Sequence, residues 1–105
     1  MFRIAENLED LMKVFFVRCC VFVEEQSIPY ALEMDGRDFE ALHILGEAGS
    51  EPVAAARMRL FGEKARLERL SVRRAYRGQG NGDRLLGFML QLARQRGFAR
   101  FQLNA

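Results

Sequence analysis

The sequence is poor in several features that mark other classes of protein. It contains no tryptophan, two prolines and two cysteines, Cys19 and Cys20, which are neighbours. Two cysteines cannot supply the four ligands of a structural zinc site, so we expect no metal and interpret both as small, reduced core residues of a cytoplasmic protein. No apolar run reaches the ~18 residues that a membrane-spanning helix needs. Residues 1–5 do not resemble the start of a secretory signal, so we expect neither export nor a membrane.

The charge of the chain is nearly balanced. Sixteen basic and fourteen acidic residues leave a net charge of +2. Such a balance is not typical of a nucleic-acid binder, and the acidic stretch of residues 26–40 argues against one as well. With 105 residues, of which 50% are hydrophobic and 29% charged, the chain is expected to form one globular domain over residues 1–105.

Hydrophobic periodicity predicts alternating strands and helices. We expect strands at residues 1–5, 41–46, 53–61, 65–72 and 98–103, and helices from Asn7 to about residues 24–26 and over 84–96. The middle strands follow one another through short turns, which predicts an antiparallel meander, and the last crossover through a helix makes the final two strands parallel. The fold class is therefore α/β, a mixed and mostly antiparallel sheet flanked by helices.

The first predicted helix is apolar on several sides. This pattern favours burial on more than one side. We interpret its stripe of Phe15, Phe16 and Phe22 as core residues. The single histidine, His43, lies among apolar residues of a predicted strand and is interpreted as a core residue too.

A basic, glycine-rich loop between a strand and a helix is the clearest chemical signal. It has the sequence YRGQGNG over residues 76–82, and Arg73 and Arg74 precede it. Glycines let the backbone approach a ligand, and the first turn of the next helix offers free N–H groups at the positive end of its dipole. The loop therefore predicts a phosphate or pyrophosphate site. It lacks the Gly-Lys-Ser/Thr of the kinase-type P-loop and the spacing of the dinucleotide fingerprint, and a turn without a ligand is the less favoured alternative.

This loop resembles one from a known enzyme family. Arg77-x-x-Gly80-x-Gly82 resembles the Arg/Gln-x-x-Gly-x-Gly/Ala loop of the GCN5-related N-acetyltransferases (GNAT), and the flanking residues 70–72 and 85–86 fit the same pattern. The first half resembles the ElaA-like bacterial subgroup, through Arg18, residues 21–26, Pro29, Glu33, Asp35, Gly36 and Asp38. The resemblance implies the GNAT acyl-CoA N-acyltransferase fold. It also implies transfer of an acetyl group from acetyl-CoA to a small amine by direct attack.

The resemblance further implies how acetyl-CoA is held. The pyrophosphate would bind the amides of the loop, with the arginine of the motif close by. The pantetheine arm would pair with the strand backbone before the loop, and the thioester would lie in a gap at the end of the last strand. The implied cofactor-binding residues are Leu70, Ser71, Val72, Arg77, Gly78, Gln79, Gly80, Asn81, Gly82, Asp83 and Asn104.

Residues for the chemistry are harder to select. Glu68, on the strand before the loop, is the candidate catalytic base, and a cross-strand ion pair with Arg57 is the favoured alternative. Acids beside the acceptor site would attract a cationic amine, although they could equally belong to a solvated loop. The candidate substrate-binding residues are Phe22, Glu25, Glu33 and Arg57.

The family pattern normally continues beyond the last strand of this sequence. A further helix and two more strands follow, and they usually supply a tyrosine that protonates the leaving thiolate. The tyrosines here, Tyr30 and Tyr76, do not match that position. We therefore expect a C-terminally truncated domain whose last strand is an exposed edge, and a homodimer that pairs through it. A catalytically impaired CoA-binding remnant or interaction module, completed by dimerisation, is the alternative function.

Overall fold

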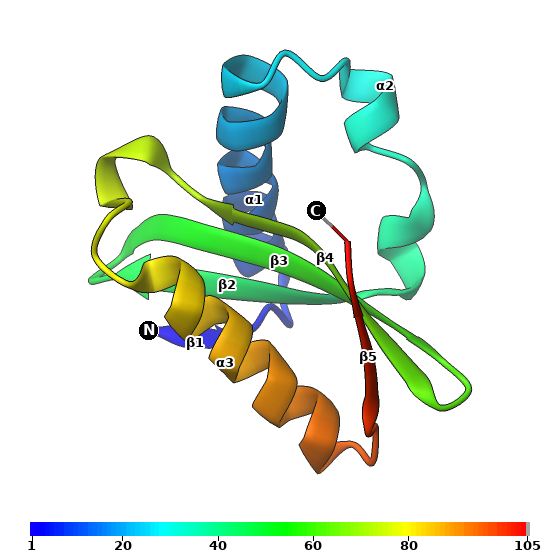
Figure 1. Ribbon diagram of the computed structural model, residues 1–105. Helices are drawn as coiled ribbons and strands as arrows, with labels where there is room; N and C mark the ends of the chain where they lie inside the picture. The colour runs from blue at the N-terminus through cyan, green and yellow to red at the C-terminus, as the bar shows by residue number, and fades with distance from the viewer. Residues whose placement is uncertain (105) are drawn as a thin grey trace.

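A single five-stranded sheet forms the centre of the computed structural model, which describes residues 1–104 (Figure 1). The strands lie side by side in chain order: β1 (Phe2–Ile4), β2 (Leu42–Ala48), β3 (Glu51–Phe61), β4 (Lys64–Val72) and β5 (Arg100–Leu103). Neighbouring strands are antiparallel, except for the parallel pair of β4 and β5. The mixed α/β sheet is thereby confirmed. Within residues 1–104, no helix is long and apolar enough to cross a bilayer.

The helical segments follow the predicted positions, with two differences in detail. They are α1 (Leu8–Arg18), the π-helical η1 (Cys19–Glu25), α2 (Tyr30–Glu33), the 3-10 turns η2 (Arg37–Glu40) and η3 (Arg74–Tyr76), and α3 (Asn81–Gln95). Asn7 caps α1, because its side-chain oxygen accepts the Asp10 N–H at 2.8 Å. The rest of the first predicted helix is wound as a π-helix. The last helix begins at Asn81 and not at Arg84, because Gly80 ends the loop in a left-handed conformation with φ 81°.

The helices α1 and α3 cover opposite faces of the sheet (Figure 1), and β3 lies between them. Its alanines alternate: Ala54 and Ala56 belong to the core under α3, while Ala55 belongs to the core under α1. Small side chains on both faces let both helices approach the strand closely. Leu85 and Met89 of α3 are fully buried in this core, so truncating either to alanine should cost about 2–5 kcal/mol of unfolding free energy.

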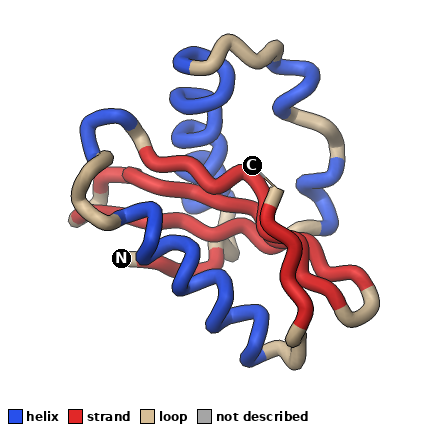
Figure 2. Tube along the Cα trace, viewed as in Figure 1, coloured by secondary structure: helices blue, strands red, loops and turns tan. Residues whose placement is uncertain are grey.

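The expectation that the first helix is buried on more than one side is wrong. One stripe, which includes Val14 and Val17, faces the sheet, whereas Met12 is 63% exposed and Phe16 is 47% exposed. Figure 2 shows α1 and the segment with α2 and η2 as separate helical stretches. Because that segment does not close over α1, the helix keeps an apolar side that borders a pocket. Phe15, Phe16 and Phe22 are therefore not buried core residues. The free thiols Cys19 and Cys20, also expected in the core, are only half-buried.

The strands β4 and β5 separate after a short paired region. Their last paired residues are Leu67 and Leu103, and the Asn104 N–H donates to the Leu67 carbonyl at 3.0 Å. Just beyond, β4 carries a bulge, because Ala55 and Arg57 of β3 stand opposite Ser71 and Glu68. Arg69 lies in this bulge at φ 57°. The β4 edge after Leu67 consequently faces a gap instead of a neighbouring strand.

Candidate functional site

The glycine loop presents a row of free amide groups at the start of α3. Within residues 1–104, the N–H groups of Gly80, Asn81, Gly82 and Asp83 donate no hydrogen bond to the chain. Gly78 and Gly80 both adopt positive φ angles, 77° and 81°, which turn the backbone sharply here. Gly80, Gly82 and Asp83 are exposed and Asn81 is half-buried, and the positive end of the α3 dipole lies behind them. This arrangement suits an anion with several oxygens, such as a pyrophosphate.

Arg77 is held at the base of this loop by Glu25. Its Nη2 lies 2.6 Å from Glu25 Oε1, and its Nε donates to the Val72 carbonyl at 2.8 Å. The hydrogen bond from Arg77, with help from Arg74, lowers the pKa of Glu25 to about 2. The structure thus places Glu25 at the basic loop, next to the predicted cofactor residues. Its role toward an acceptor stays a prediction.

A pocket of about 340 Å³ fills the gap between β4 and β5. It brings together Phe22 from η1, Glu33 from α2, Leu70 from the β4 bulge and Asn104 after β5. All four were predicted site residues, and they come from four separate parts of the chain. On β4 the pocket is lined by Arg69 and Leu70. The strand itself continues through Ser71 and Val72 toward the glycine loop. An extended ligand could therefore follow the free strand edge from the loop into the gap.

A buried network of charged side chains holds the α2–η2 segment to the sheet. Arg18 is fully buried and donates to Glu33 Oε2 and Asp38 Oδ1, each at 2.7 Å. Arg57 is 1% exposed and contacts Asp35 at 2.8 Å and Asp38 at 3.1 Å. Buried charges are tolerated when they are paired and hydrogen-bonded in this way. Two of the predicted substrate residues, Glu33 and Arg57, therefore also stabilise the fold through their ion pairs.

Of the ion pairs formed by these charged residues, the sequence predicted only the pair of Arg57 with Glu68. Arg69, at the bulge, adds a second cation to Glu33 at 3.1 Å and one to Asp35 at 3.3 Å. The available signals were the arginine in an apolar helix, Arg18, and the closely spaced acids Glu33, Asp35 and Asp38. Those signals indicate charges that need partners, but they do not say which cation meets which acid.

Glu68 stands opposite Arg57 in the β3–β4 register, which confirms the predicted cross-strand pairing. Arg59 Nε donates to Glu68 Oε1 at 2.5 Å, and Arg57 Nη2 lies 3.5 Å from Oε2. Burial alone would raise the pKa of Glu68, but the Arg59 hydrogen bond and the charge of Arg57 bring the pKa below its usual value. A general base works best with a pKa near the operating pH, so this environment favours an ion-pair role. The catalytic role of Glu68 stays a prediction.

His43 lies on β2, apart from the loop and the gap. It is 5% exposed, and its Nε2 is 2.9 Å from the carbonyl oxygen of Asp38. Burial lowers the pKa of the imidazole, so the ring is neutral at pH 7. These contacts agree with the interpretation of a core histidine, although the ring also borders the pocket beside α1.

The free amides at a helix start, beside a splayed pair of parallel strands, agree with the acyl-CoA site that the sequence predicts. The sequence profile of the Acetyltransferase (GNAT) family matches residues 5–105, and the chain belongs to this family. The expected GNAT acyl-CoA N-acyltransferase fold is thereby confirmed, and acetyltransferase function is supported.

Three relatives illustrate the similarity. The chain is 37% identical to the uncharacterized N-acetyltransferase YjcF of Bacillus subtilis, over 97% of this chain and 73% of the relative. The crystal structure of Escherichia coli ElaA has a TM-score of 0.88 at 29% identity, covering 100% of this chain and 77% of ElaA. An acyl-CoA N-acyltransferase from Pseudomonas aeruginosa has a TM-score of 0.88 at 26% identity, covering 100% of this chain and 78% of that one. The chain thus spans about three quarters of each relative.

Proposed function

We propose that this acetyltransferase transfers the acetyl group of acetyl-CoA to a small amine by direct attack. The observation that carries the proposal is the continuity of the site: free amides at 80–83, a free β4 edge, and a pocket in the β4–β5 gap. The amides of Gly80 to Asp83 would bind the pyrophosphate, and the β4 backbone at 70–72 would pair with the pantetheine arm. Acetyl-CoA supplies the activated thioester, and the residues of this chain position it.

The pocket in the gap would receive the acceptor amine. Phe22 and Ile28 give it an apolar wall, and Asn104 and Glu33 give it polar groups. Glu33 is already paired with Arg18 and Arg69, so the pocket offers little net negative charge. We infer that the acceptor is a small amine with an apolar neighbouring group. In the reaction the amine nitrogen bonds to the acetyl carbon, the carbon–sulfur bond breaks, the thiolate of CoA leaves, and the ammonium proton is lost.

Calorimetric titration of the purified chain with acetyl-CoA tests the first part of this proposal. We expect micromolar binding, about −8 kcal/mol. A screen of small amines that follows the release of the CoA thiol then tests turnover. Absence of binding by a folded chain would contradict the site assignment. Binding without turnover for any amine would favour the second candidate.

That second candidate is a CoA-binding module with impaired catalysis that is completed by a second copy. It is favoured by the β5 strand, which within residues 1–104 pairs with β4 alone and whose Leu103 is 58% exposed. A strand with one unpaired edge is a template for pairing with another chain. Light scattering tests this candidate, because the chain would have twice its own mass of 12.1 kDa. A monomer that turns over acetyl-CoA would rule it out.

A further inference from the structure

The arginines that precede the glycine loop are already paired with carboxylates. Arg73 lies 2.7 Å from Glu51. Arg74 and Arg77 both contact Glu25, at 3.4 Å and 2.5 Å. The sequence places these cations where they would attract a phosphate, but each has an internal anion as its partner. A phosphate that approaches the loop therefore competes with a carboxylate for the arginines.

Glu25 binds Arg77 in the geometry with which an arginine holds an anionic ligand. The two carboxylate oxygens accept from the two terminal nitrogens of Arg77, at 2.6 Å for Oε1 and 2.5 Å for Oε2. The remaining nitrogen, Nε, donates to the Val72 carbonyl at 2.8 Å and fixes the direction of the guanidinium. Carboxylates and phosphates both accept such paired hydrogen bonds from arginine. Glu25 thus occupies the edge of Arg77 that a phosphate would use.

The Glu25–Arg77 pair is accessible to solvent. Glu25 is half-buried at the end of η1, whereas Arg74 and Arg77 are exposed. Ion pairs between exposed side chains contribute little free energy, because water solvates both partners well. A pyrophosphate or a ribose phosphate carries more negative charge and more acceptor oxygens than a carboxylate. Replacing the carboxylate by such a group therefore costs little and gives a stronger ion pair.

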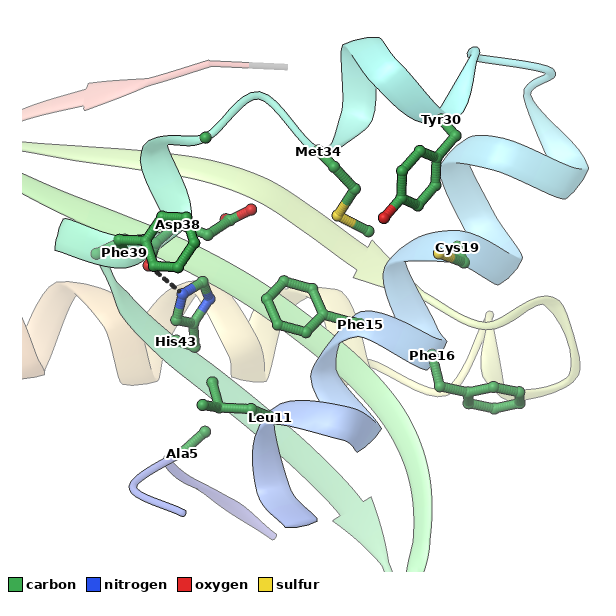
Figure 3. A pocket seen from close by; sticks show the side chains of 12 residues that line it. Ala5, Leu11, Phe15, Phe16, Cys19, Tyr30, Met34, Asp38, Phe39 and His43 are labelled. Atoms are coloured by element: carbon green, nitrogen blue, oxygen red, sulfur yellow. Dashed lines mark hydrogen bonds between the residues drawn. The ribbon is translucent and has the colours of Figure 1, made fainter. Parts of the chain in front are cut away.

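A groove of about 580 Å³ opens beside this pair. Its charged lining residues are Glu24, Glu25, Arg73 and Arg74, from η1 and from the turn that contains η3. It shares no lining residue with the larger, mostly apolar pocket beside α1 (Figure 3). An anion that enters the groove meets acids as well as arginines, and the acids repel it.

We propose that Glu25 is an internal competitor of acetyl-CoA, which occupies Arg77 with the help of Arg74 in the free protein and is displaced by a phosphate group of the cofactor. The proposal rests on the proposed binding of acetyl-CoA at the glycine loop. It goes beyond that function, because it assigns a residue that lowers the affinity for the cofactor.

An internal competitor has a physical benefit for the fold. Arg73, Arg74 and Arg77 are close together in the chain, and their like charges repel one another. Glu25 relieves this repulsion and connects η1 to the loop, between residues that are far apart in the sequence. The chain thereby gains stability in the free protein and loses affinity for the cofactor, a common trade between stability and activity.

Calorimetric titration with acetyl-CoA tests the proposal in two matched variants. Glu25→Gln removes the pairing carboxylate. Glu24→Gln is the control, because Glu24 lines the same groove and forms no ion pair within residues 1–104. Both variants lose one negative charge, but only the first frees Arg77. We expect Glu25→Gln to bind acetyl-CoA about three- to tenfold more tightly than Glu24→Gln. Equal affinities, or weaker binding by Glu25→Gln, would overturn the proposal.

The same comparison in an Arg77→Gln background shows whether the gain depends on the guanidinium. There, Glu25→Gln and Glu24→Gln should differ by less than about twofold in their affinity for acetyl-CoA. An undiminished advantage of Glu25→Gln in this background would contradict the proposal. Urea unfolding of each variant verifies the fold. Glu25→Gln should be slightly less stable than the wild type and yet bind more tightly, which a purely structural role of Glu25 would not produce.

A second ligand identifies the phosphate that displaces Glu25. Dephospho-CoA lacks the ribose phosphate of CoA. A gain for Glu25→Gln with both ligands assigns the pyrophosphate, and a gain with CoA alone assigns the ribose phosphate. If neither the wild type nor any variant binds acetyl-CoA, the proposed function fails together with this proposal. If the wild type binds and Glu25→Gln has no advantage over Glu24→Gln, this proposal alone fails.

Discussion

Two glycines of α3, Gly82 and Gly87, offer a direct test of the pyrophosphate site. Both are exposed, neither has a positive φ, and a Cβ added at either meets no atom within 4 Å. Leucine is favoured over glycine in a helix by up to about 1 kcal/mol, so neither Gly82→Leu nor Gly87→Leu should lower stability. The two differ in position, because Gly82 belongs to the row of free amides and Gly87 lies about 7.5 Å further along the helix.

The expected effect on binding follows from that difference. The loop pattern accepts alanine at the position of Gly82, but a leucine side chain there crowds the space where the phosphate oxygens approach the amides, and it should cost at least one charge-assisted hydrogen bond. Such a bond is worth about 1.5–3 kcal/mol, which corresponds to a loss of roughly 10- to 150-fold in affinity for acetyl-CoA. Gly87→Leu should bind acetyl-CoA like the wild type.

Calorimetry measures the affinities, and urea unfolding measures the stabilities of the same preparations. The reasoning is refuted if Gly82→Leu binds acetyl-CoA as tightly as Gly87→Leu does. Gly80→Ala would be a less discriminating variant. Its φ of 81° is strained for alanine, and its new Cβ would lie 3.0 Å from Arg84 Nη1, so changes in folding and binding would be mixed.

Further expectations concern the charged groups. Arg18→Met should lower the free energy of unfolding by about 3–5 kcal/mol in a urea titration, because it leaves the buried carboxylate of Glu33 without one of its cationic partners. A loss below 1 kcal/mol would contradict a stabilising role of the charged network. The pKa of Glu25 is lowered from 4.5 to about 2, so its pairing with Arg77 stabilises the fold fully above pH 4.5 and is lost as the pH falls through about 2. Thermal melting should accordingly show a wild-type advantage over Glu25→Gln that disappears across this window, and an advantage independent of pH would refute it. Glu68→Gln should destabilise the fold by about 1–3 kcal/mol and leave the shape of the pH–rate profile intact, whereas loss of the acidic limb without destabilisation would identify Glu68 as the base.

Much of the fold follows from local patterns. The apolar segment of β3, the Asn7 cap and the glycine-rich loop are short-range features, because each depends on residues within a few positions of one another. The start of α3 was misplaced for an equally local reason. The conformation of Gly80 decides where the helix begins, and glycine is compatible with either side of that boundary.

The candidate site could be predicted only in part. The loop residues and Leu70 to Val72 lie together because they are close in the chain. Phe22, Glu33 and Asn104 were also assigned to the site, but that assignment depended on resemblance to a family and not on the residues alone. These three residues line one pocket because β4 and β5 diverge after their last paired residues and leave a gap between them.

By itself, the sequence determined the order of the elements, the mixed sheet and the basic loop that begins α3. The tertiary structure alone decided that Arg18, from an apolar helix, meets Glu33 and Asp38, and that Phe15 lines a pocket instead of entering the core. The physical reason is that burial and ion pairing depend on distances between residues far apart in the chain. The periodicity of the sequence predicts which face of a helix or strand a side chain occupies, but only the tertiary structure shows which residues pack against that face.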